Sequence, residues 1–488
     1  MSRLHEVQIS ALPMDRLRAV IGEERLRSWR AVAAAVRDAL AGRTVWNVNA
    51  TAVGGGVAEM LQVVLAYARG AGIDTRWLVI EGDAEFFLIT KRLHNRLHGA
   101  AGDGGPLDAA EHAVLERGWA ANAARLVGVV RPGDIVILHD PQTAGLVDAL
   151  RGGGATVVWR SHIGADMVNG RVAQAWEFLR GWLEPADAFV FSRRAHVHAW
   201  MPEPKVAIIP PSIDPLSPKN QPLDHPTVRA ILGRTGFLDP GAGGAPMFQR
   251  RDGSPGAVAR RAAFPRRGAV PTGDTPLVVQ VSRWDRLKDM AGVLRAFADH
   301  VPPPAHLALV GPAVDGVVDD PEGSAVLAEC VAAYDRLLPG PVQARVHLVS
   351  LPVDDPDENA VMVNAFQRHA AVVVQKSLQE GFGLTVTEAM IKARPIVASR
   401  VGGIQDQIRH EREGLLVDDP ADLAGFVAAV NRLLTDPSLA ERLGEAAHIR
   451  AVEDFVGDRH LTRYADLLLG LGAASTPRPG VGLVRSPR

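Results

Sequence analysis

The sequence predicts an α/β protein with two doubly wound domains, each built around a parallel sheet. The chain of 488 residues is too long for one ordinary core and suits two domains of about 200 residues each. Apolar residues make up 47% of the chain, which is ample for burial in two cores. Short apolar strands alternate with helical segments in both halves, and this alternation is typical of parallel doubly wound sheets.

The expected strands fall on either side of a polar, proline-rich passage at 210–226. We therefore predict an N-terminal domain over residues 1–220 and a C-terminal domain over residues 221–457. Strands of the first domain are expected at 44–50, 77–80, 134–138, 156–159 and 188–191. Strands of the second domain are expected at 276–281, 306–310, 346–351, 371–374 and 396–399.

The charge and cysteine content exclude several classes of protein. Lys and Arg number 53 against 55 Asp and Glu, so no overall field favours nucleic acid or an anionic membrane. The single cysteine, Cys330, cannot form an internal disulfide, and we interpret it as a core residue of a helix at 323–338. No apolar stretch reaches the roughly 20 residues that span a bilayer, and residues 1–42 lack a signal-peptide core. We expect a soluble, cytoplasmic protein.

Two segments depart from the alternation of strands and helices. Residues 239–273 are rich in Gly, Pro and Arg, and we interpret them as a flexible, solvated insertion. A lid or partner contact biased toward anions is the alternative. It rests on the basic pairs Arg250-Arg251, Arg260-Arg261 and Arg266-Arg267. The tail at 473–488 is expected to be disordered.

The most informative motif is a glycine loop that opens directly into a helix. The apolar run 371–374 predicts a buried strand, so Gly381 and Gly383 fall at the strand-to-helix turn. Backbone N–H groups at such a turn, together with the helix dipole, favour a phosphate. Glu380 precedes the loop and Glu388 lies one turn into the helix, so the carboxylates can face a hexose and a ribose of one ligand. The same layout also occurs in α/β proteins without a ligand.

Two cations follow the expected strand at 276–281. Arg283 and Lys288 flank the next strand-to-helix turn. A departing nucleoside diphosphate gathers negative charge, and fixed cations at its oxygens would stabilise the transition state more than the ground state. Two solvated surface cations are the alternative interpretation.

A third glycine turn, Gly54-Gly55-Gly56, follows the first expected strand and precedes an amphipathic helix at 57–68. It lacks the third glycine of a dinucleotide fingerprint and the Gly-Lys-Ser/Thr ending of a P-loop. Neither nicotinamide binding nor NTP hydrolysis is therefore favoured. A loop that closes over a diphosphate from the first domain fits better.

Motifs in order from about residue 9 to about residue 469 resemble the trehalose glycosyltransferring synthases, retaining glycosyltransferases of family 4 with the GT-B fold. The matching segments are Asn47-Val48-Asn49, Gly54-Gly55-Gly56-Val57-Ala58-Glu59-Met60-Leu61, Pro210-Pro211-Ser212-Ile213-Asp214-Pro215-Leu216-Ser217, Gln280-Val281-Ser282-Arg283, Asp320-Pro321-Glu322-Gly323, Asn364-Ala365-Phe366-Gln367-Arg368 and the run from Glu380 to Met390.

The resemblance implies two Rossmann-like domains facing a central cleft, with a last helix at about 458–472 crossing back to the first domain. It implies reversible transfer of glucose from a nucleoside diphosphate glucose to free glucose, which gives trehalose with retained configuration. It implies no cofactor and no metal. The only partners it implies are sugar and nucleotide-sugar substrates, and dimers are common among such enzymes.

Residue by residue, the resemblance assigns Arg283 and Lys288 to the diphosphate, Glu388 to the ribose and Glu380 to the transferred hexose. Glu380 is then a positioning residue rather than a nucleophile. The backbone amides assigned to the sugar and phosphate are those of Gly381, Phe382, Gly383, Leu384 and Thr385.

The remaining assignments lie in the first domain. The resemblance places His162 beside the donor sugar and the reacting centre, and Gly55 and Gly56 over the diphosphate. The acceptor sugar is expected at the carboxyl edge of the first sheet, where parallel sheets bind ligands, near His139, Asp140 and Gln142. The loop 164–170 is longer than in relatives, so acceptor contacts in it are left unassigned.

Other activities share parts of this pattern. Paired carboxylates also occur in glycosidases, but hydrolysis needs neither a cation pair nor two phosphate-type glycine loops. A trehalose phosphorylase and a non-catalytic nucleotide-sugar-binding regulator both stay open. Glu388 favours the synthase, because a phosphorylase has no ribose to hold. The sequence does not distinguish UDP, ADP, GDP and TDP donors, and it leaves the physiological direction and oligomeric state open.

Overall fold

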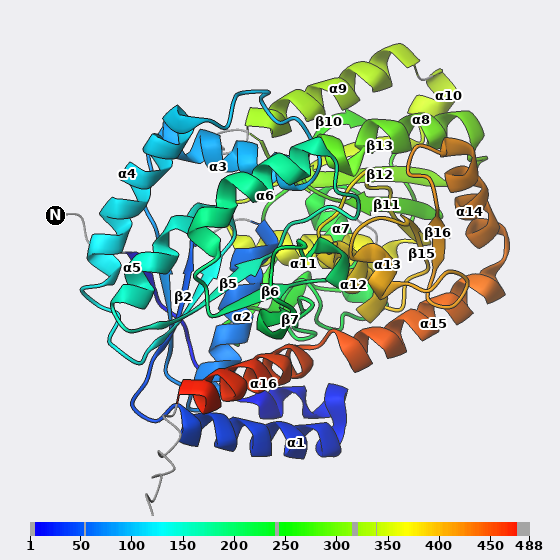
Figure 1. Cartoon of the computed structure of the whole chain (residues 1–488). Helices are drawn as coiled ribbons and strands as arrows, with labels where there is room; N and C mark the ends of the chain where they lie inside the picture. Colours follow the sequence, from blue (N-terminus) through cyan, green and yellow to red (C-terminus); the bar gives the residue numbers. More distant parts are fainter. Residues whose placement is uncertain (1–4, 53–54, 240–243, 315–320, 338, 476–488) are drawn as a thin grey trace, which may run out of the picture. The chain divides into compact units, whose positions relative to one another are not determined.

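The computed structural model describes residues 5–52, 55–239, 244–314, 321–337 and 339–475 (Figure 1). These residues form two compact units. Unit 1 comprises the described residues within 1–162, 169–210 and 457–488, and unit 2 those within 163–168 and 211–456. Each unit has its own sheet, so the predicted α/β class with two parallel-sheet domains is confirmed.

Unit 1 is built on a seven-stranded sheet with the order β1-β3-β2-β4-β5-β6-β7. Its strands are parallel except β1, which pairs antiparallel with β3. The strands are β1 (His5–Val7), β2 (Val45–Asn49), β3 (Thr75–Val79), β4 (Ile135–His139), β5 (Thr156–Ser161), β6 (Ala188–Phe191) and β7 (Val206–Ile208). The α-helices are α1 (Arg18–Ala39), α2 (Gly55–Gly70), α3 (Ala84–Leu97), α4 (Ala109–Leu126), α5 (Val147–Gly152), α6 (Gly170–Leu183) and α16 (Gly457–Ser475).

Helices α1 and α16 pack together on the sheet of unit 1. Val36 of α1 and Tyr464 of α16 share one buried cluster with Ile135 and Ile137 of β4. The C-terminal helix therefore belongs to the same unit as the N-terminal strands, where the sequence analysis places it. Residues 476–488 of the predicted tail lie outside the described residues.

Unit 2 also has a seven-stranded sheet, with the order β10-β13-β12-β11-β14-β15-β16, and a separate two-stranded sheet of β8 and β9. Only β10 is antiparallel within the larger sheet. The strands are β8 (Met247–Gln249), β9 (Pro255–Ala257), β10 (Ala263–Arg267), β11 (Leu277–Val281), β12 (His306–Pro312), β13 (Val346–Leu351), β14 (Val372–Gln375), β15 (Ile396–Ser399) and β16 (Leu415–Val417). The α-helices are α7 (His225–Thr235), α8 (Met290–His300), α9 (Pro321–Leu337), α10 (Gly340–Gln343), α11 (Pro356–His369), α12 (Leu384–Ile391), α13 (Ile404–Gln407), α14 (Leu423–Thr435) and α15 (Pro437–Asp454).

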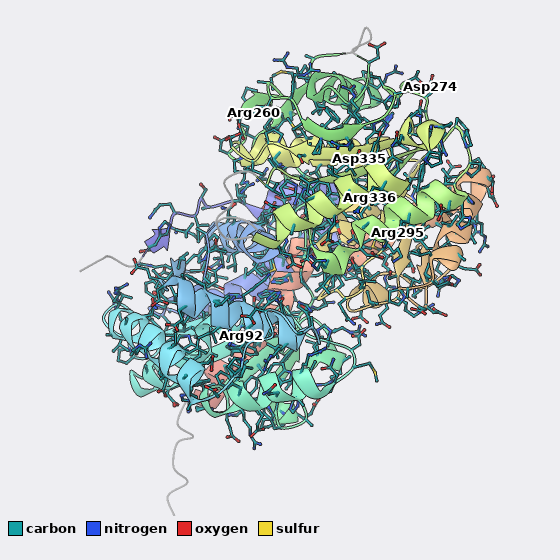
Figure 2. The ribbon with its side chains drawn as sticks, turned by 90° about the horizontal axis from the view of Figure 1, so that it is seen from above. Arg92, Arg260, Asp274, Arg295, Asp335 and Arg336 are labelled. Atoms are coloured by element: carbon teal, nitrogen blue, oxygen red, sulfur yellow. The ribbon has the colours of Figure 1, made fainter. Side chains whose placement is uncertain are left out.

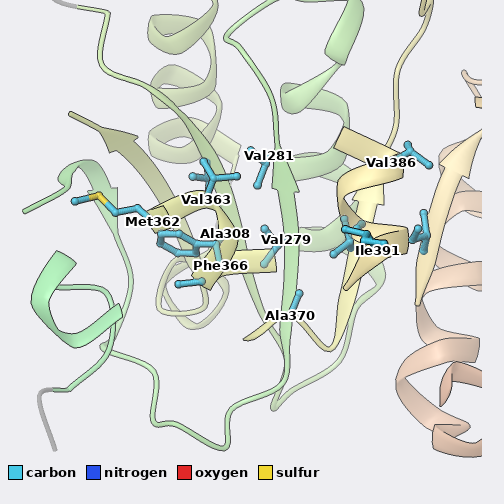
Figure 3. Packing of buried hydrophobic residues seen from close by; sticks show 14 of the residues in the cluster. Val279, Val281, Ala308, Met362, Val363, Phe366, Ala370, Val386 and Ile391 are labelled. Carbon is cyan, nitrogen blue, oxygen red and sulfur yellow. The ribbon is translucent and has the colours of Figure 1, made fainter. Parts of the chain in front are cut away.

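Alternate residues of the unit 2 strands enter two different cores, as a sheet covered on both faces requires. Val279 and Val281 of β11 pack with Phe366 of α11 and Val386 of α12 (Figure 3). Val278, between them in sequence, belongs to the opposite core with α8, α9 and α14. The continuous apolar runs that predicted these strands are thus explained by burial on both sides.

The described part of the insertion at 239–273 is not the flexible, solvated linker that the sequence predicts. Its described residues, 244–273, contain β8, β9 and β10, and β10 pairs with β13 of the main sheet. Phe248 and Val258 are buried in the unit 2 core. The wrong interpretation arose because the apolar residues here are sparse and are spread over short strands, which leaves little periodicity to detect.

The arginine pairs of the insertion also have partners within unit 2. Arg250 donates to both carboxylate oxygens of Asp355, the N-cap of α11, at 3.1 and 2.8 Å. Arg260, labelled in Figure 2, forms an ion pair with buried Glu358 in the first turn of that helix. Arg266 pairs with Asp335 of α9. These ion pairs hold the insertion against the rest of unit 2. They also neutralise the arginine charges on which the alternative of an anion site rested.

Two smaller predictions concern Cys330 and membrane association. Cys330 is fully buried in α9, and burial raises the pKa of its thiol to about 12, so its interpretation as a core residue is confirmed. Among the described residues, no helix has both the length and the apolar content needed to cross a membrane.

Candidate active site

The glycine loop of unit 2 lies where the sequence places it, between β14 and α12. Gly383 is the N-cap of α12 and has φ 86° and ψ 61°, a left-handed conformation that glycine adopts without strain. No side chain of the described residues caps this helix start, so the N–H groups of Leu384 and Thr385 could face a ligand, whereas that of Val386 donates to the Gly383 carbonyl at 2.9 Å. Because β11 and β14 are neighbouring parallel strands, the turn after β11 lies beside this loop.

A second glycine pair, Gly402-Gly403, packs against the backbone of this loop. The Gly403 amide donates to the Gly381 carbonyl at 3.0 Å. A Cβ atom on Gly402 would lie 1.6 Å from the Glu380 carbonyl oxygen, and Gly402 has a φ of 49°. Only a residue without a side chain lets the two loops approach this closely. The backbone position of Glu380 is therefore set by tight packing.

Lys288 and Glu380 form an ion pair in unit 2, with 2.6 Å between Nζ and Oε2. The Ser377 hydroxyl donates to the same carboxylate oxygen at 3.1 Å. The Gln280 side chain donates to the Lys288 carbonyl at 2.7 Å, so it fixes the turn that carries the lysine. The structure thus brings together the cation and the carboxylate that the sequence assigned to the diphosphate and the hexose.

The residue after Lys288 is held in an unusual backbone conformation. Asp289 has φ 46° and ψ 43°, which is rare for a residue with a side chain. Its carboxylate caps α8 by accepting from the Gly292 amide at 3.1 Å and pairs with buried Lys376. These contacts keep the turn that carries Lys288 in one conformation.

Glu388 lies on α12 and is 4% exposed. Its Oε1 is 3.5 Å from Nζ of Lys219, whereas its Oε2 has no hydrogen-bond partner among the described residues. Below it, Lys392 is fully enclosed and donates to the Glu388 carbonyl at 2.8 Å, to Gln367 and to Asn220. Burial moves the pKa of Lys392 well below its ordinary value.

The other predicted residues of unit 2 have mixed environments. Arg283 follows β11, has a half-exposed side chain and lies 3.5 Å from Asp285. The Phe382 ring is buried against Phe455, so only its backbone could meet a ligand. Leu384 packs partly against the core, and the Thr385 hydroxyl donates to the Gln375 side chain at 2.9 Å.

In unit 1, His139 and His162 lie at the ends of the neighbouring strands β4 and β5. His139 Nδ1 is 2.9 Å from His162 Nε2, and their rings are nearly parallel. His139 Nε2 is 3.1 Å from Oδ1 of Asn47 on β2. His139 is thus a buried partner of His162, and its ring nitrogens are already engaged within unit 1.

Asp140 directly follows β4 and has φ 64° and ψ 175°, a combination that is costly for any residue other than glycine. Its Oδ1 accepts from the His162 amide at 2.7 Å. Burial raises the pKa of this carboxyl group to about 7, although the His162 amide and Arg160 both oppose the shift. Strain and an unfavourable charge are therefore concentrated at the residue that orients the His162 backbone.

The remaining predictions for unit 1 concern the first glycine turn and Gln142. Helix α2 begins at Gly55, and Gly56 is exposed in its first turn. Gly54 lies outside the described residues. Gln142 lies in the short helix Pro141–Leu146, and its carbonyl accepts from Trp119 at 2.7 Å.

The structure also shows contacts that sequence reasoning missed. Lys219 approaches Glu388 from a loop far away in the chain, and Lys376 reaches Asp289 from the next strand. Asp166, in the loop left unassigned, accepts from the Gly402 amide at 2.9 Å and from Gln405 at 2.8 Å. No local sequence pattern predicts such pairs, because each pair joins residues that are distant in the sequence.

Two family models match the chain. The one described as "Trehalose synthase, N-terminal domain" covers residues 47–198, and the one described as "Glycosyl transferases group 1" covers residues 356–450. The trehalose synthase of Pyrococcus horikoshii is 33% identical over 467 residues, which are 94% of this chain and 96% of the relative. The chain belongs to the trehalose synthase family.

Other relatives agree with this membership. The trehalose synthase of Rubrobacter xylanophilus is 34% identical to this trehalose synthase family member, over 84% of this chain and 87% of the relative. The trehalose phosphorylase of Pleurotus pulmonarius is 28% identical, over 84% of this chain but only 54% of the relative. The family member is therefore a glycosyltransferase of trehalose-related carbohydrate metabolism.

Solved structures of other enzymes share the fold of this trehalose synthase family member. The sucrose-phosphate synthase of Thermosynechococcus elongatus aligns with a TM-score of 0.63 at 18% identity, covering 89% of this chain and all 100% of that one. A trehalose-phosphate synthase of Burkholderia xenovorans aligns with a TM-score of 0.65 at 15% identity, over 88% of this chain and 100% of that one. The fold is GT-B, as the resemblance implied.

Proposed function

We propose that the protein transfers glucose from a nucleoside diphosphate glucose to free glucose and so forms trehalose, reversibly and with retained anomeric configuration. In this proposal unit 2 holds the donor. The glycine turn before α12 receives the diphosphate, Glu380 positions the glucose and Glu388 holds the ribose. Family membership supports the trehalose product, and the chemistry of the unit 2 side chains supports the activated donor.

The observation that carries the proposal is the unpartnered oxygen of Glu388. Oε2 is buried and has no hydrogen-bond partner among the described residues, whereas Oε1 is near Lys219. A buried carboxylate oxygen without a donor costs about 1–3 kcal/mol or more, so a ligand that donates here gains that energy. The two hydroxyls of a ribose are such donors. A phosphorylase uses inorganic phosphate in place of a nucleoside diphosphate, so its substrates bring no ribose to this oxygen.

The ion pair between Lys288 and Glu380 supports the assignment of the reacting part of the donor. A diphosphate is a stronger partner for Lys288 than one carboxylate, because it spreads more charge over more oxygens. When the diphosphate takes over the Lys288 ammonium, Glu380 is left to accept hydroxyl protons from the glucose. The ion pair between Lys288 and Glu380 supports neighbouring roles for these two groups in the proposed donor site.

The proposed reaction balances without a protein nucleophile. The bond between glucose C1 and the phosphate oxygen breaks, and a bond from C1 to the acceptor oxygen forms on the same face of the ring. The acceptor hydroxyl gives its proton to the departing phosphate oxygen. Arg283 and Lys288 stabilise the charge on the diphosphate, which is greatest in the transition state. Because these two cations carry that charge, we propose that turnover needs no metal ion.

A donor panel tests the proposal. UDP-, ADP-, GDP- and TDP-glucose would each be incubated with free glucose, with and without EDTA, and the product linkage read by NMR. We expect α,α-linked trehalose from at least one donor, also in EDTA. A parallel incubation of trehalose with inorganic phosphate, or with a nucleoside diphosphate, distinguishes the alternatives. Turnover with phosphate alone, or a product of inverted configuration, would overturn the proposal.

A further inference from the structure

A chain of buried polar groups crosses the sheet of unit 1 and ends at His162. It runs from the Val45 carbonyl through Thr75, Asn47 and His139 to His162, and we call these groups the unit 1 relay. Thr75, Asn47 and His139 are 2%, 3% and 2% exposed, so bulk solvent does not compete for their hydrogen bonds. Each bond of the relay therefore has a definite direction.

The direction is set at the Val45 end. The Thr75 hydroxyl lies 3.0 Å from the Val45 carbonyl, which can only accept, so the hydroxyl hydrogen points there. The lone pairs of the Thr75 hydroxyl oxygen then point toward Asn47, and this oxygen accepts a hydrogen bond from Asn47 Nδ2 at 3.4 Å. This contact turns the amide so that Oδ1 faces His139 Nε2 at 3.1 Å. An amide oxygen can only accept, so His139 carries its hydrogen on Nε2.

The second half of the relay follows from the neutrality of His139. Burial lowers the pKa of His139 to about 3, and the nearby Arg160 guanidinium lowers it further. Arg160 is itself buried and donates to the Tyr464 hydroxyl and the Ile209 carbonyl. A neutral His139 with its hydrogen on Nε2 has a lone pair on Nδ1. It must therefore accept from His162 Nε2, which lies 2.9 Å away.

We infer that the unit 1 relay fixes His162 as the neutral tautomer with its hydrogen on Nε2, so that Nδ1 is a dedicated hydrogen-bond acceptor. Thr75, Asn47 and His139 are then positioning residues. Among the described residues, Nδ1 of His162 has no hydrogen-bond partner, whereas Nε2 faces His139, and the residue as a whole is intermediate between buried and exposed. Burial also keeps the pKa of His162 well below its ordinary value.

The consequence for recognition concerns the sort of group that His162 can bind. A neutral nitrogen lone pair accepts a hydroxyl hydrogen and offers no attraction to a phosphate ester. We therefore expect His162 to accept a hydrogen bond from one hydroxyl of a sugar. This expected contact rests on the proposed function, whereas the tautomer itself does not.

NMR of the ligand-free protein tests the tautomer directly. With ¹⁵N-labelled histidine, long-range proton–nitrogen spectra distinguish a protonated ring nitrogen from one with a lone pair, and His162→Gln identifies the signals. We expect wild-type His162 to be neutral, with Nε2 protonated. A hydrogen on Nδ1 in the wild type would overturn the inference. Because no substrate is present, a failure of glucose transfer leaves this result unaffected.

Variants test whether the relay sets the tautomer. Asn47→Asp places a carboxylate beside His139 Nε2, which favours a doubly protonated His139 that donates to His162 and moves the His162 hydrogen to Nδ1. Thr75→Val removes the acceptor that orients Asn47, so a mixture of tautomers is expected, whereas Thr75→Ser keeps the wild-type spectrum. Thr90→Val removes another buried threonine hydroxyl of unit 1, away from the relay, and should leave His162 unchanged. An unaltered His162 in both Asn47→Asp and Thr75→Val would overturn the inference, and the wild-type spectrum decides the tautomer if either variant fails to fold.

Activity gives a second readout that a merely structural role would not change. We expect Asn47→Asp and Thr75→Val to lower kcat/KM by about tenfold or more, the loss of one good hydrogen bond, with recovery in Thr75→Ser. Glucose analogues lacking one hydroxyl at a time would be compared as acceptors and, as nucleoside diphosphate derivatives, as donors. Wild type should discriminate against one analogue, and Asn47→Asp should lose that discrimination. Equal discrimination in both proteins would contradict the assigned role of the Nδ1 lone pair.

Discussion

The candidate site groups of the two units differ in their chemistry. In unit 2 they are ions held in pairs, such as Lys288 with Glu380 and Lys219 with Glu388. In unit 1 the side chains of the relay, Thr75, Asn47 and His139, are neutral and are ordered by the direction of their hydrogen bonds. Ion pairs can exchange partners when a charged ligand arrives, whereas a directed relay presents a fixed acceptor. The difference suits a charged diphosphate in unit 2 and a neutral hydroxyl in unit 1.

The comparison is tested most strongly at Lys288. Lys288→Ala should lower turnover by at least about tenfold, and by as much as about 10²–10³-fold if the ammonium acts mainly in the transition state. Steady-state kinetics with a saturating donor would measure this. Arg286→Ala is the matched control, because Arg286 lies in the same turn but pairs with exposed Glu329. A Lys288→Ala enzyme as fast as the control would show that charge in unit 2 is not catalytic.

The unit 2 charges depend on the close approach of the two glycine loops. Gly402→Ala would place a methyl group against the Glu380 carbonyl in a left-handed backbone conformation. We expect a loss of about 1–3 kcal/mol in the free energy of unfolding, as for other overpacked sites, together with reduced activity. Denaturant unfolding would measure the stability. Gly340→Ala is the control, since a Cβ atom there meets nothing within 4 Å, and equal stability of both variants would contradict the packing argument.

The role of Glu388 sharpens the comparison further, because it separates binding from chemistry. Glu388→Ala should raise the KM for the nucleotide sugar roughly tenfold, the value of one hydrogen bond to a charged group, with little change in kcat. The KM for free glucose should stay the same. Glu329→Ala removes an exposed carboxylate of the same unit and should change neither constant. A loss confined to the glucose KM would contradict the ribose assignment.

Asp140 is the exception within unit 1, because it carries a carboxyl group beside the neutral histidines. Its pKa of about 7 lies above the ordinary 3.8, so the folded protein holds a proton that the unfolded chain releases. The stability gained from that proton is complete below about pH 4 and is lost as the pH rises through 7. Asp140→Asn keeps an acceptor for the His162 amide without a charge.

This exception predicts an effect on stability that depends on pH. The melting temperature of Asp140→Asn relative to wild type should rise between about pH 4 and pH 8 and level off at higher pH. Thermal unfolding followed by circular dichroism would show it. Asp108→Asn is the control: the Ala110 amide lowers the pKa of this exposed helix cap, so its difference from wild type should be flat above pH 4. Parallel curves for the two variants would refute an unfavourable charge at Asp140.

The sequence predicted much of the architecture because burial on both faces of a parallel sheet leaves a clear signal. The expected strand at 134–138 corresponds to β4 (Ile135–His139), and that at 396–399 to β15. The short edge strands β1, β7, β10 and β16 were missed. Strands of three to five residues at a sheet edge need few apolar residues, so their pattern cannot be distinguished from that of a loop.

For the candidate site, the sequence by itself indicated the glycine turn before α12 and the cations after β11, because each belongs to a contiguous motif at the end of a strand. The role of the histidine after β5 came only from the family resemblance. Only the tertiary structure decided that Lys288 pairs with Glu380, that Oε2 of Glu388 lacks a partner within the described part of the chain, and that His139 hydrogen-bonds to His162. The physical reason is that hydrogen-bond direction and charge pairing depend on distances between residues far apart in the chain. Local sequence patterns determine which side chains lie at the edge of a sheet. The packing of the chain determines which of these side chains contact one another.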